Sequence, residues 1–315
     1  LFLLTMSASA LHASPAGPER WYFTHFTTDD GLAFNSVTSI AQDSNGFIWF
    51  ATEDGLSRYD GRSFRNFSKE DLGLDTDFIT QLCADGNGNL WIGSDNGASR
   101  YDFISDSFIP LDAVSDKGTA LRGKVTHICI DDGGRVWMSV NGLGLFSYDP
   151  ATERLRNFFC EDGRTTLPFN IRTFAIDGNG DFWLSLYFAD IWHSDSGLQN
   201  IERVEIAGWR ENDDIVSMER SAPGRIILSS WKNGLGEFDC KKRSFRQYLA
   251  YGAGQRPKNM HYDRNNRRVW AATTRGLCMY DLNTGDTTCL ASNVQDGFSL
   301  SGDNITAVFM DASDG

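Results

Sequence analysis

Short stretches in which apolar and polar residues alternate recur along the chain at intervals of just over forty residues. They include SVTSIAQD from Ser36, FITQLCAD from Phe78, VTHICIDD from Val125, IRTFAIDG from Ile171 and IVSMERSA from Ile215. Alternation with a period of two residues places successive side chains on opposite faces of an extended segment. Each stretch therefore predicts a half-buried β-strand.

Three further short segments follow each of these stretches. A turn containing Gly or Asn leads into an aromatic-rich segment such as FIWFAT, LWIGS or VWMSV. A second turn leads into a segment ending in Tyr-Asp, as in EDGLSRYD, and the unit closes with a segment such as SFRNF or RLRNF. Tight turns between short alternating runs are typical of β-hairpins. Each unit is thus predicted to be a four-stranded antiparallel sheet.

Tryptophan marks the second strand of most units, at Trp49, Trp91, Trp137, Trp183 and Trp270. Ile227 occupies the corresponding position between the last two, and the successive spacings are then 42, 46, 46, 44 and 43 residues. One small sheet cannot bury both of its faces, but a ring of such sheets packs each against the next. The repeat therefore predicts an all-β propeller in which the tryptophan packs between neighbouring blades.

The number of units predicts seven blades. Six units are complete, and a seventh begins with NITAVFMDASDG at Asn304. The segment WYFTHFT from Trp21 matches the outermost strand of other units, such as SFRNFS. We therefore expect residues 21–315 to form a seven-bladed β-propeller, with six complete blades and a truncated seventh that the N-terminal strand closes. On this interpretation the sequence is a fragment of a longer chain.

The N-terminal residues and the charge bear on location and partners. LFLLTMSASALHASPAG combines an apolar run with small residues, so residues 1–13 are interpreted as the remnant of a secretory signal peptide and the rest as periplasmic. No later run is long and apolar enough to cross a bilayer. The formal net charge of −13 disfavours nucleic acid as a partner of this region.

Motifs for catalysis or metal binding are missing from the sequence. The five histidines, His12, His25, His127, His193 and His261, form no short ligand spacing with another His or Cys. No phosphate loop, nucleophile elbow or HExxH string occurs. The DGNGD segment at Asp177 resembles the start of a calcium loop, but Phe182 stands where glycine is required. We expect no metal, no cofactor and no enzymatic activity in this region, with a propeller lyase or hydrolase and a protein-interaction scaffold as alternatives.

The unit DGLAFNSVTSIAQDSNGFIWFATEDGLSRYD resembles the propeller repeat of two-component regulators, and the resemblance extends over residues 21–315. It implies the periplasmic sensor of a hybrid histidine kinase with two seven-bladed propellers and a further β-domain. A membrane helix, kinase, receiver and often a DNA-binding domain would follow. It also implies an oligosaccharide ligand, a homodimer in the full-length protein and membrane attachment only through the downstream segment. Two units depart from the pattern: YFADIW replaces the Gly-Leu turn of the fourth, and the fifth has Ile227 and an inserted SAPG.

Candidate ligand-binding residues lie on two kinds of loop, those joining the second and third strands and those entering each blade, which are expected to crowd one rim. The candidates are Asn141, Tyr187, Trp209, Arg210, Trp231, Lys232 and Arg275, and the same loops carry Glu53, Asp54, Asp95, Arg122 and Lys124. Aromatic faces suit sugars, and arginine can hold a carboxylate or sulfate with two hydrogen bonds. Tyr187, Trp231 and Arg275 are the strongest candidates, because the other units usually have a small polar residue at the corresponding position. The alternative for most of these residues is an ordinary solvated loop.

The six cysteines are Cys83, Cys129, Cys160, Cys240, Cys278 and Cys289. Cys83 and Cys129 occupy equivalent first-strand positions and are expected to be small, buried, reduced packing residues. Cys278 and Cys289 flank one hairpin and lie opposite each other if Tyr280 pairs with Thr287, within reach of a disulfide. A one-residue bulge would turn them to opposite faces. Both alternatives remain open, and the sequence interpretation favours two free thiols.

Overall fold

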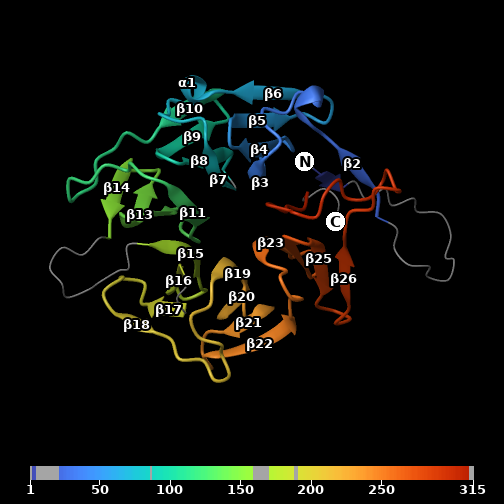
Figure 1. Ribbon diagram of the computed structural model, residues 1–315. Helices are drawn as coiled ribbons and strands as arrows, with labels where there is room; N and C mark the ends of the chain where they lie inside the picture. The colour runs from blue at the N-terminus through green and yellow to red at the C-terminus, as the bar shows by residue number, and fades with distance from the viewer. Residues whose placement is uncertain (1, 5–20, 86, 159–169, 188–190, 312–315) are drawn as a thin grey trace.

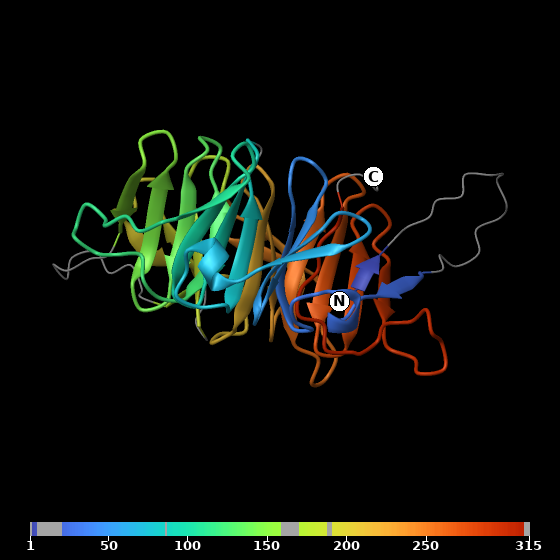
Figure 2. The same ribbon diagram turned by 90° about the horizontal axis from the view of Figure 1, so that it is seen from above.

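The computed structural model describes residues 2–4, 21–85, 87–158, 170–187 and 191–311. Six four-stranded antiparallel sheets surround a central axis, and within each sheet strands that follow one another in sequence are neighbours (Figure 1). In Figure 2 the strands run across the thickness of the ring, so their turns gather on its two opposite faces. The predicted all-β propeller is therefore confirmed.

We number the blades one to six in chain order. Each blade has four strands, which run from the innermost, at the ring axis, to the fourth, at the outer edge of the ring. The first, innermost strands are β3 (Val37–Gln42), β7 (Ile79–Ala84), β11 (Val125–Ile130), β15 (Ile171–Ile176), β19 (Ile215–Ala222) and β23 (Pro257–Asp263). The second strands are β4 (Ile48–Thr52), β8 (Asn89–Ser94), β12 (Val136–Val140), β16 (Phe182–Leu186), β20 (Arg225–Ser230) and β24 (Arg268–Thr273).

The outer half of each blade is equally regular. The third strands are β5 (Gly55–Tyr59), β9 (Gly97–Asp102), β13 (Gly144–Asp149), β17 (Ile191–Ser194), β21 (Gly234–Asp239) and β25 (Gly276–Asp281). The fourth strands are β6 (Phe64–Phe67), β10 (Ser107–Pro110), β14 (Arg154–Asn157), β18 (Ile201–Arg203), β22 (Ser244–Leu249) and β26 (Thr287–Leu290). Short elements outside the blades are β1 (Phe2–Leu4), β2 (Phe23–His25), the 3-10 helix η1 (Thr28–Asp30) and helix α1 (Lys69–Leu72).

The recurring tryptophans pack between blades, as their spacing predicts. The ring of Trp49 lies 4.8 Å from that of Tyr101 in the next blade, and Trp91 lies 5.5 Å from Tyr148. The indole Nε1 of Trp49 donates to Oδ2 of Asp43 in the preceding turn at 2.7 Å. In the first four blades the tryptophan thus buries apolar area while its polar atom stays hydrogen-bonded, which suits a blade interface. In the sixth blade Nε1 of Trp270 is buried and has no hydrogen-bond partner among the described residues.

Threonines of the innermost strands connect successive blades through side-chain hydrogen bonds. Oγ1 of Thr38 donates to the carbonyl of Ile79 at 2.6 Å, and Oγ1 of Thr80 donates to that of Val125 at 2.7 Å. Innermost strands of neighbouring blades lie in different sheets, so backbone hydrogen bonds of the sheets do not join them. These threonine bonds therefore fix the spacing of the blades around the axis.

The prediction of seven blades is wrong, because the described residues form six four-stranded blades. The N-terminal strand β2 pairs with β1, with Phe23 opposite Leu4, and is not the outer strand of a further blade. The segment from Asn304 forms no sheet strand, although N of Ile305 donates to the carbonyl of Thr273 and Oγ1 of Thr306 to that of Val37. This segment lies between the sixth and first blades (Figure 1). A single extended segment without sheet partners is not a blade, because a blade requires a hydrogen-bonded ladder.

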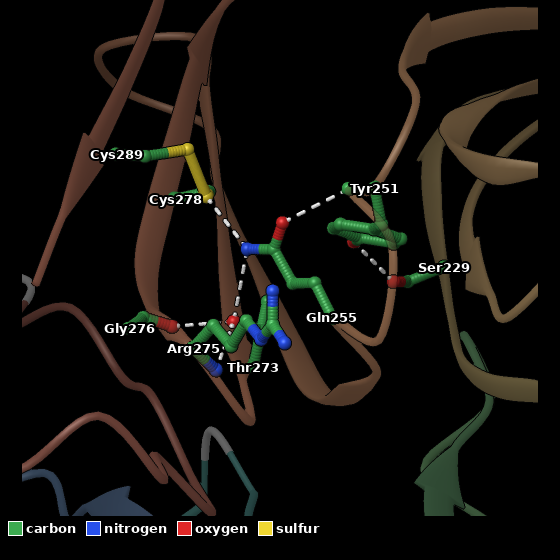
Figure 3. The surroundings of a disulfide bond; sticks show 9 residues. Ser229, Tyr251, Gln255, Thr273, Arg275, Gly276, Cys278 and Cys289 are labelled. Carbon is green, nitrogen blue, oxygen red and sulfur yellow. Dashed lines mark hydrogen bonds between the residues drawn. A yellow bond between two sulfur atoms is a disulfide. The ribbon is translucent and has the colours of Figure 1, made fainter.

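The structure contains a disulfide between Cys278 and Cys289, with 4.1 Å between their Cα atoms (Figure 3). Tyr280 pairs with Thr287 as the sequence predicts, and β25 and β26 continue without a bulge. The preference for free thiols at this pair is therefore wrong. Cys83 and Cys129 are free, as expected, but they are half-buried and line a cavity on the ring axis, so the prediction that they are buried is wrong. Cys160 lies outside the described residues.

The interpretation of residues 1–13 as a signal remnant falls largely outside the described residues, of which only 2–4 belong to it. Among the residues that the structure describes, no helix has the length and apolar character needed to span a bilayer.

Candidate functional site

The two kinds of loop that carry the predicted ligand-binding residues contact each other on one face of the ring. N of Asn141, in the β12–β13 loop, donates to the carbonyl of Lys124 in the loop entering β11 at 2.8 Å. N of Trp231, in the β20–β21 loop, donates to the carbonyl of Asp214 at 3.1 Å. The expected rim therefore exists, with its loops joined by backbone hydrogen bonds.

Tyr187 lies at the end of β16, with 40% of its surface exposed. The guanidinium carbon of Arg172, from the innermost strand of the same blade, lies 5.2 Å from the centroid of its ring. Arg172 also forms an ion pair with Asp214 at the entrance to the fifth blade, and the side chain of Asp214 is 1% exposed. Tyr187 is thus connected to the next blade through a cation and a buried carboxylate.

Trp231 continues this connection toward the sixth blade. The guanidinium carbon of Arg256 lies 4.5 Å from the centroid of its ring. N of Arg256 donates to Oγ1 of Thr274 at 3.0 Å, and N of Thr274 donates to the carbonyl of Arg256 at 2.9 Å. Arg275 follows directly and is exposed. The three strongest predicted residues therefore lie along one continuous set of contacts over the fourth, fifth and sixth blades.

The other predicted rim residues have different surroundings. Lys232 is exposed, and its Nζ donates to the carbonyl of Glu211 at 2.9 Å. Arg210 is exposed and donates from Nη1 to the carbonyl of Lys232 at 3.4 Å. Trp209 is half-buried, with its ring 5.1 Å from that of Phe245 in an edge-on arrangement, so it packs the fifth blade. Asn141 lies on the third blade, apart from this group.

Arg172, Asp214 and Arg256 were not among the predicted residues, although the sequence carries a signal for the first. Arg172 stands second in its innermost strand, where Thr38, Thr80 and Thr126 stand in the first three blades. The threonines donate hydrogen bonds to the backbone of the next blade. The longer side chain of Arg172 also reaches the next blade, where it forms an ion pair with Asp214. No local pattern marks Asp214 or Arg256.

A second candidate site is a cavity of about 560 Å³ on the ring axis, lined by all six innermost strands. The residues that pair with the recurring tryptophan position face it: Ala41, Cys83, Cys129, Ala175, Glu219 and His261. Blades five and six therefore place ionisable side chains where the first four place small ones. The equivalence of Cys83 and Cys129 was predicted from the sequence, whereas the role of Glu219 and His261 was not.

The polar side of this cavity centres on Glu219. Its Oε1 lies 4.0 Å from Nδ1 of His261, and its Oε2 accepts a hydrogen bond from N of Tyr262 at 3.1 Å. Burial raises the pKa of Glu219, and the neighbouring His261 opposes that shift. Burial also raises the pKa of Cys83 and of Cys129 to about 12, so both thiols stay protonated and are poor nucleophiles. The side chains of Glu219 and His261 can therefore form hydrogen bonds with a polar ligand in the cavity.

The described residues contain no group of three or more His, Cys, Asp or Glu side chains arranged to hold a metal ion.

Comparison with known proteins supports the family resemblance. Residues 31–54 and 73–96 match the family model of the two-component regulator propeller. These segments span the first-strand and tryptophan regions of the first two blades. Both segments therefore carry two-component regulator propeller repeats, as the sequence predicts.

A curated relative is the histidine kinase P4 of Formosa agariphila, 46% identical over 43 residues, which are 14% of this chain and 3% of the relative. Among solved structures, the extracellular domain of one putative hybrid two-component system of B. thetaiotaomicron superposes with a TM-score of 0.79 at 20% identity, covering 93% of this chain and 40% of that one. A second such domain from that organism gives a TM-score of 0.71 at 21% identity, covering 88% and 36%. This chain thus spans well under half of these relatives.

Virginiamycin B lyase of Staphylococcus aureus shares the fold as well, with a TM-score of 0.60 at 10% identity over 82% of this chain and 85% of that one. At such identities the superpositions establish the propeller fold and nothing more specific.

Proposed function

We propose that residues 21–315 are the extracytoplasmic ligand-sensing propeller of a two-component signalling protein, which detects an oligosaccharide and regulates a downstream histidine kinase. The observation that carries this proposal is the pair of two-component regulator propeller repeats at residues 31–54 and 73–96. Extracellular domains of hybrid two-component systems have this same propeller fold, so the fold suits the proposed role and a periplasmic location. In the full-length protein the propeller would act as a homodimer.

The rim of blades four to six is the proposed binding surface. Tyr187 and Trp231 offer aromatic faces, and Arg172, Arg256 and Arg275 surround them with guanidinium groups. Sugars bind aromatic faces through their apolar ring faces, and fixed polar groups around them select hydroxyl positions. Because Arg172 and Arg256 already contact the aromatic rings, a ligand here would meet a preorganised surface, which lowers the entropic cost of binding.

The test is oligosaccharide binding by this chain on a glycan array, followed by calorimetry on the hits. Tyr187→Ala combined with Trp231→Ala should weaken binding at least tenfold. Asn141→Ala, on the third blade, should leave it unchanged. The same mixtures analysed by mass spectrometry should contain intact sugar, as expected for a sensor. Cleavage of the sugar would favour an enzyme, and binding of no oligosaccharide would reject the proposed ligand class.

A further inference from the structure

A cleft of about 490 Å³ lies between the fifth and sixth blades, away from the rim site. It is bordered by Ser221 and Ala222, at the end of the first strand β19, and by residues of the β23–β24 turn, which joins a first to a second strand. Rim loops instead join second to third strands, so the cleft reaches the opposite face of the ring. Its lining includes three tyrosines and three arginines: Tyr248, Tyr262, Tyr280, Arg246, Arg264 and Arg267.

The blade interface beside the cleft lacks the tryptophan that the other blades have. In the first blade Trp49 lies between two rings, 5.7 Å from Phe67 of its own outer strand and 4.8 Å from Tyr101 of the next blade. In the fifth blade the smaller Ile227 occupies the tryptophan position. The rings of Tyr248 and Tyr280 stack directly on each other there, with centroids 4.8 Å apart and planes 8° apart.

A break in strand register brings Tyr248 into this position. Leu235 of β21 pairs with Leu249, but the neighbouring Gly236 pairs with Gln247, so Tyr248 is an extra residue without a partner in the ladder. In the first blade the corresponding strands pair continuously from Leu56 to Tyr59. A β-bulge redirects the side chain of the extra residue and is common beside binding sites. The bulge at Tyr248 and the replacement of tryptophan by Ile227 therefore both occur in the fifth blade, at its interface with the sixth.

The charges of the cleft leave a surplus of cations. Its one carboxylate, Glu237, accepts from Ser221 at 2.9 Å and from Arg225 at 3.1 Å. Among the residues that the structure describes, Arg246 and Arg267 form no ion pair, and both are exposed. Arg246 lies over the ring of Tyr248, with its guanidinium carbon 5.8 Å from the centroid. In a protein of net charge −13, two such arginines beside stacked tyrosines favour an anionic ligand.

The backbone at Arg267 supports this interpretation. Its φ is +54°, and it stands three residues before the tryptophan, where the first five blades have glycine, as in Gly46 with φ +85°. A positive φ costs a non-glycine residue of order 1 kcal/mol, and such residues concentrate at binding sites. The chain therefore keeps an arginine at the edge of the cleft in spite of a conformational cost.

We propose that this cleft binds an acidic saccharide, with the sugar ring against Tyr248 and Tyr280 and its carboxylate or sulfate held by Arg246 and Arg267. The proposal rests on the oligosaccharide-sensing function above and adds a second site with a defined ligand class. A planar guanidinium can hold either oxyanion with two hydrogen bonds, and the stacked phenol rings provide an apolar wall for the sugar.

The test measures binding of uronate-bearing and sulfated oligosaccharides to this chain by calorimetry, each beside its neutral counterpart, with inorganic sulfate as a further probe. The variant Arg246→Gln/Arg267→Gln should weaken binding of an acidic sugar at least tenfold. The control Arg62→Gln/Arg154→Gln removes two exposed arginines of other blades, with the same change in net charge, and should have little effect. Tyr248→Ala should weaken acidic-sugar binding as well.

The possible outcomes separate the cleft from the rim. Acidic sugars that bind equally well to the cleft variants would overturn the cleft proposal. If only neutral sugars bind and Tyr187→Ala/Trp231→Ala removes that binding, the cleft proposal fails and the rim function stands. Binding of inorganic sulfate alone at Arg246 and Arg267 would reject the saccharide. If no sugar of either kind binds, oligosaccharide sensing fails together with the cleft proposal.

Discussion

Gln255 donates a hydrogen bond from Nε2 to Sγ of the disulfide-bonded Cys278 at 3.4 Å (Figure 3). The same nitrogen donates to Oγ1 of Thr273 at 3.1 Å. Gln255 lies in the loop that leads into the sixth blade, and the next residue, Arg256, covers the ring of Trp231. The disulfide therefore supports the loop that carries part of the proposed rim site.

Removal of the disulfide should lower stability. The bridge closes a short loop, with a sequence separation of 11, and the loop-closure entropy of such a link corresponds to about 2–3 kcal/mol. We expect Cys278→Ser/Cys289→Ser to lower the Tm by about 5 °C in thermal unfolding. Reduction of the unaltered protein should produce a similar shift. A reducing agent should not change the Tm of the double variant, and an equal effect on both proteins would assign the shift to something other than this bridge.

The Arg172–Asp214 ion pair should be more important for stability than an exposed pair elsewhere on the rim. Arg172→Leu leaves the carboxylate of Asp214, which is 1% exposed, without this cation, and we expect a loss of about 3 kcal/mol in unfolding free energy. The control is Arg122→Leu, because Arg122 and Asp75 form a 3.1 Å pair with side chains 65% and 62% exposed. That change should cost less than about 1 kcal/mol in denaturant unfolding. Equal losses would show that burial does not determine the difference.

Restoration of the missing tryptophan should be unfavourable in the fifth blade. Ile227 is fully buried, and Tyr248 and Tyr280 already stack where the ring would lie, so we expect Ile227→Trp to cost about 1–3 kcal/mol through overpacking. Ile227→Val, which removes one methylene, should cost about 1 kcal/mol. Chemical denaturation of both variants measures the difference. A more stable Ile227→Trp protein would mean that the tyrosine stack leaves room for the ring.

Acid should destabilise the protein in part through His127, which lines the axial cavity. Burial lowers the pKa of His127 from 6.5 to about 4, and a hydrogen bond with the backbone of Phe174 opposes that shift. Between these values the unfolded chain binds a proton that the folded chain does not, so the unfolding free energy should fall as the pH drops from 6.5 to 4.

The measurement compares the pH dependence of Tm for the unaltered protein and His127→Gln. The decline between pH 6.5 and 4 should be smaller in the variant. The comparison cancels the contribution of Glu219, whose raised pKa acts in the opposite direction, since protonation of that carboxyl favours the folded state. Parallel curves for the two proteins would contradict the assignment to His127.

The sequence by itself determined the blade, because a blade is built from local patterns. The alternation in strands such as β3, the turn glycines such as Gly46 and the spacing from Trp49 to Trp91 are all contained within one or two units. Hydrogen-bonded hairpins depend on residues close in sequence, so their register could be counted in advance, as for Cys278 and Cys289. The departures at Ile227 and Arg172 were also present in the sequence as breaks in the repeat.

Only the tertiary structure decided what depends on contacts between distant residues. The pairing of β2 with β1, and the position of the Asn304 segment beside Val37, follow from where the ends of the ring meet, which no local pattern specifies. The ion pair from Arg172 to Asp214 joins residues of different blades, and the Tyr248–Tyr280 stack requires a bulge in one blade and a missing ring in its interface with the next. Side-chain packing between blades depends on the geometry of both surfaces together, and a repeat read one unit at a time does not contain it.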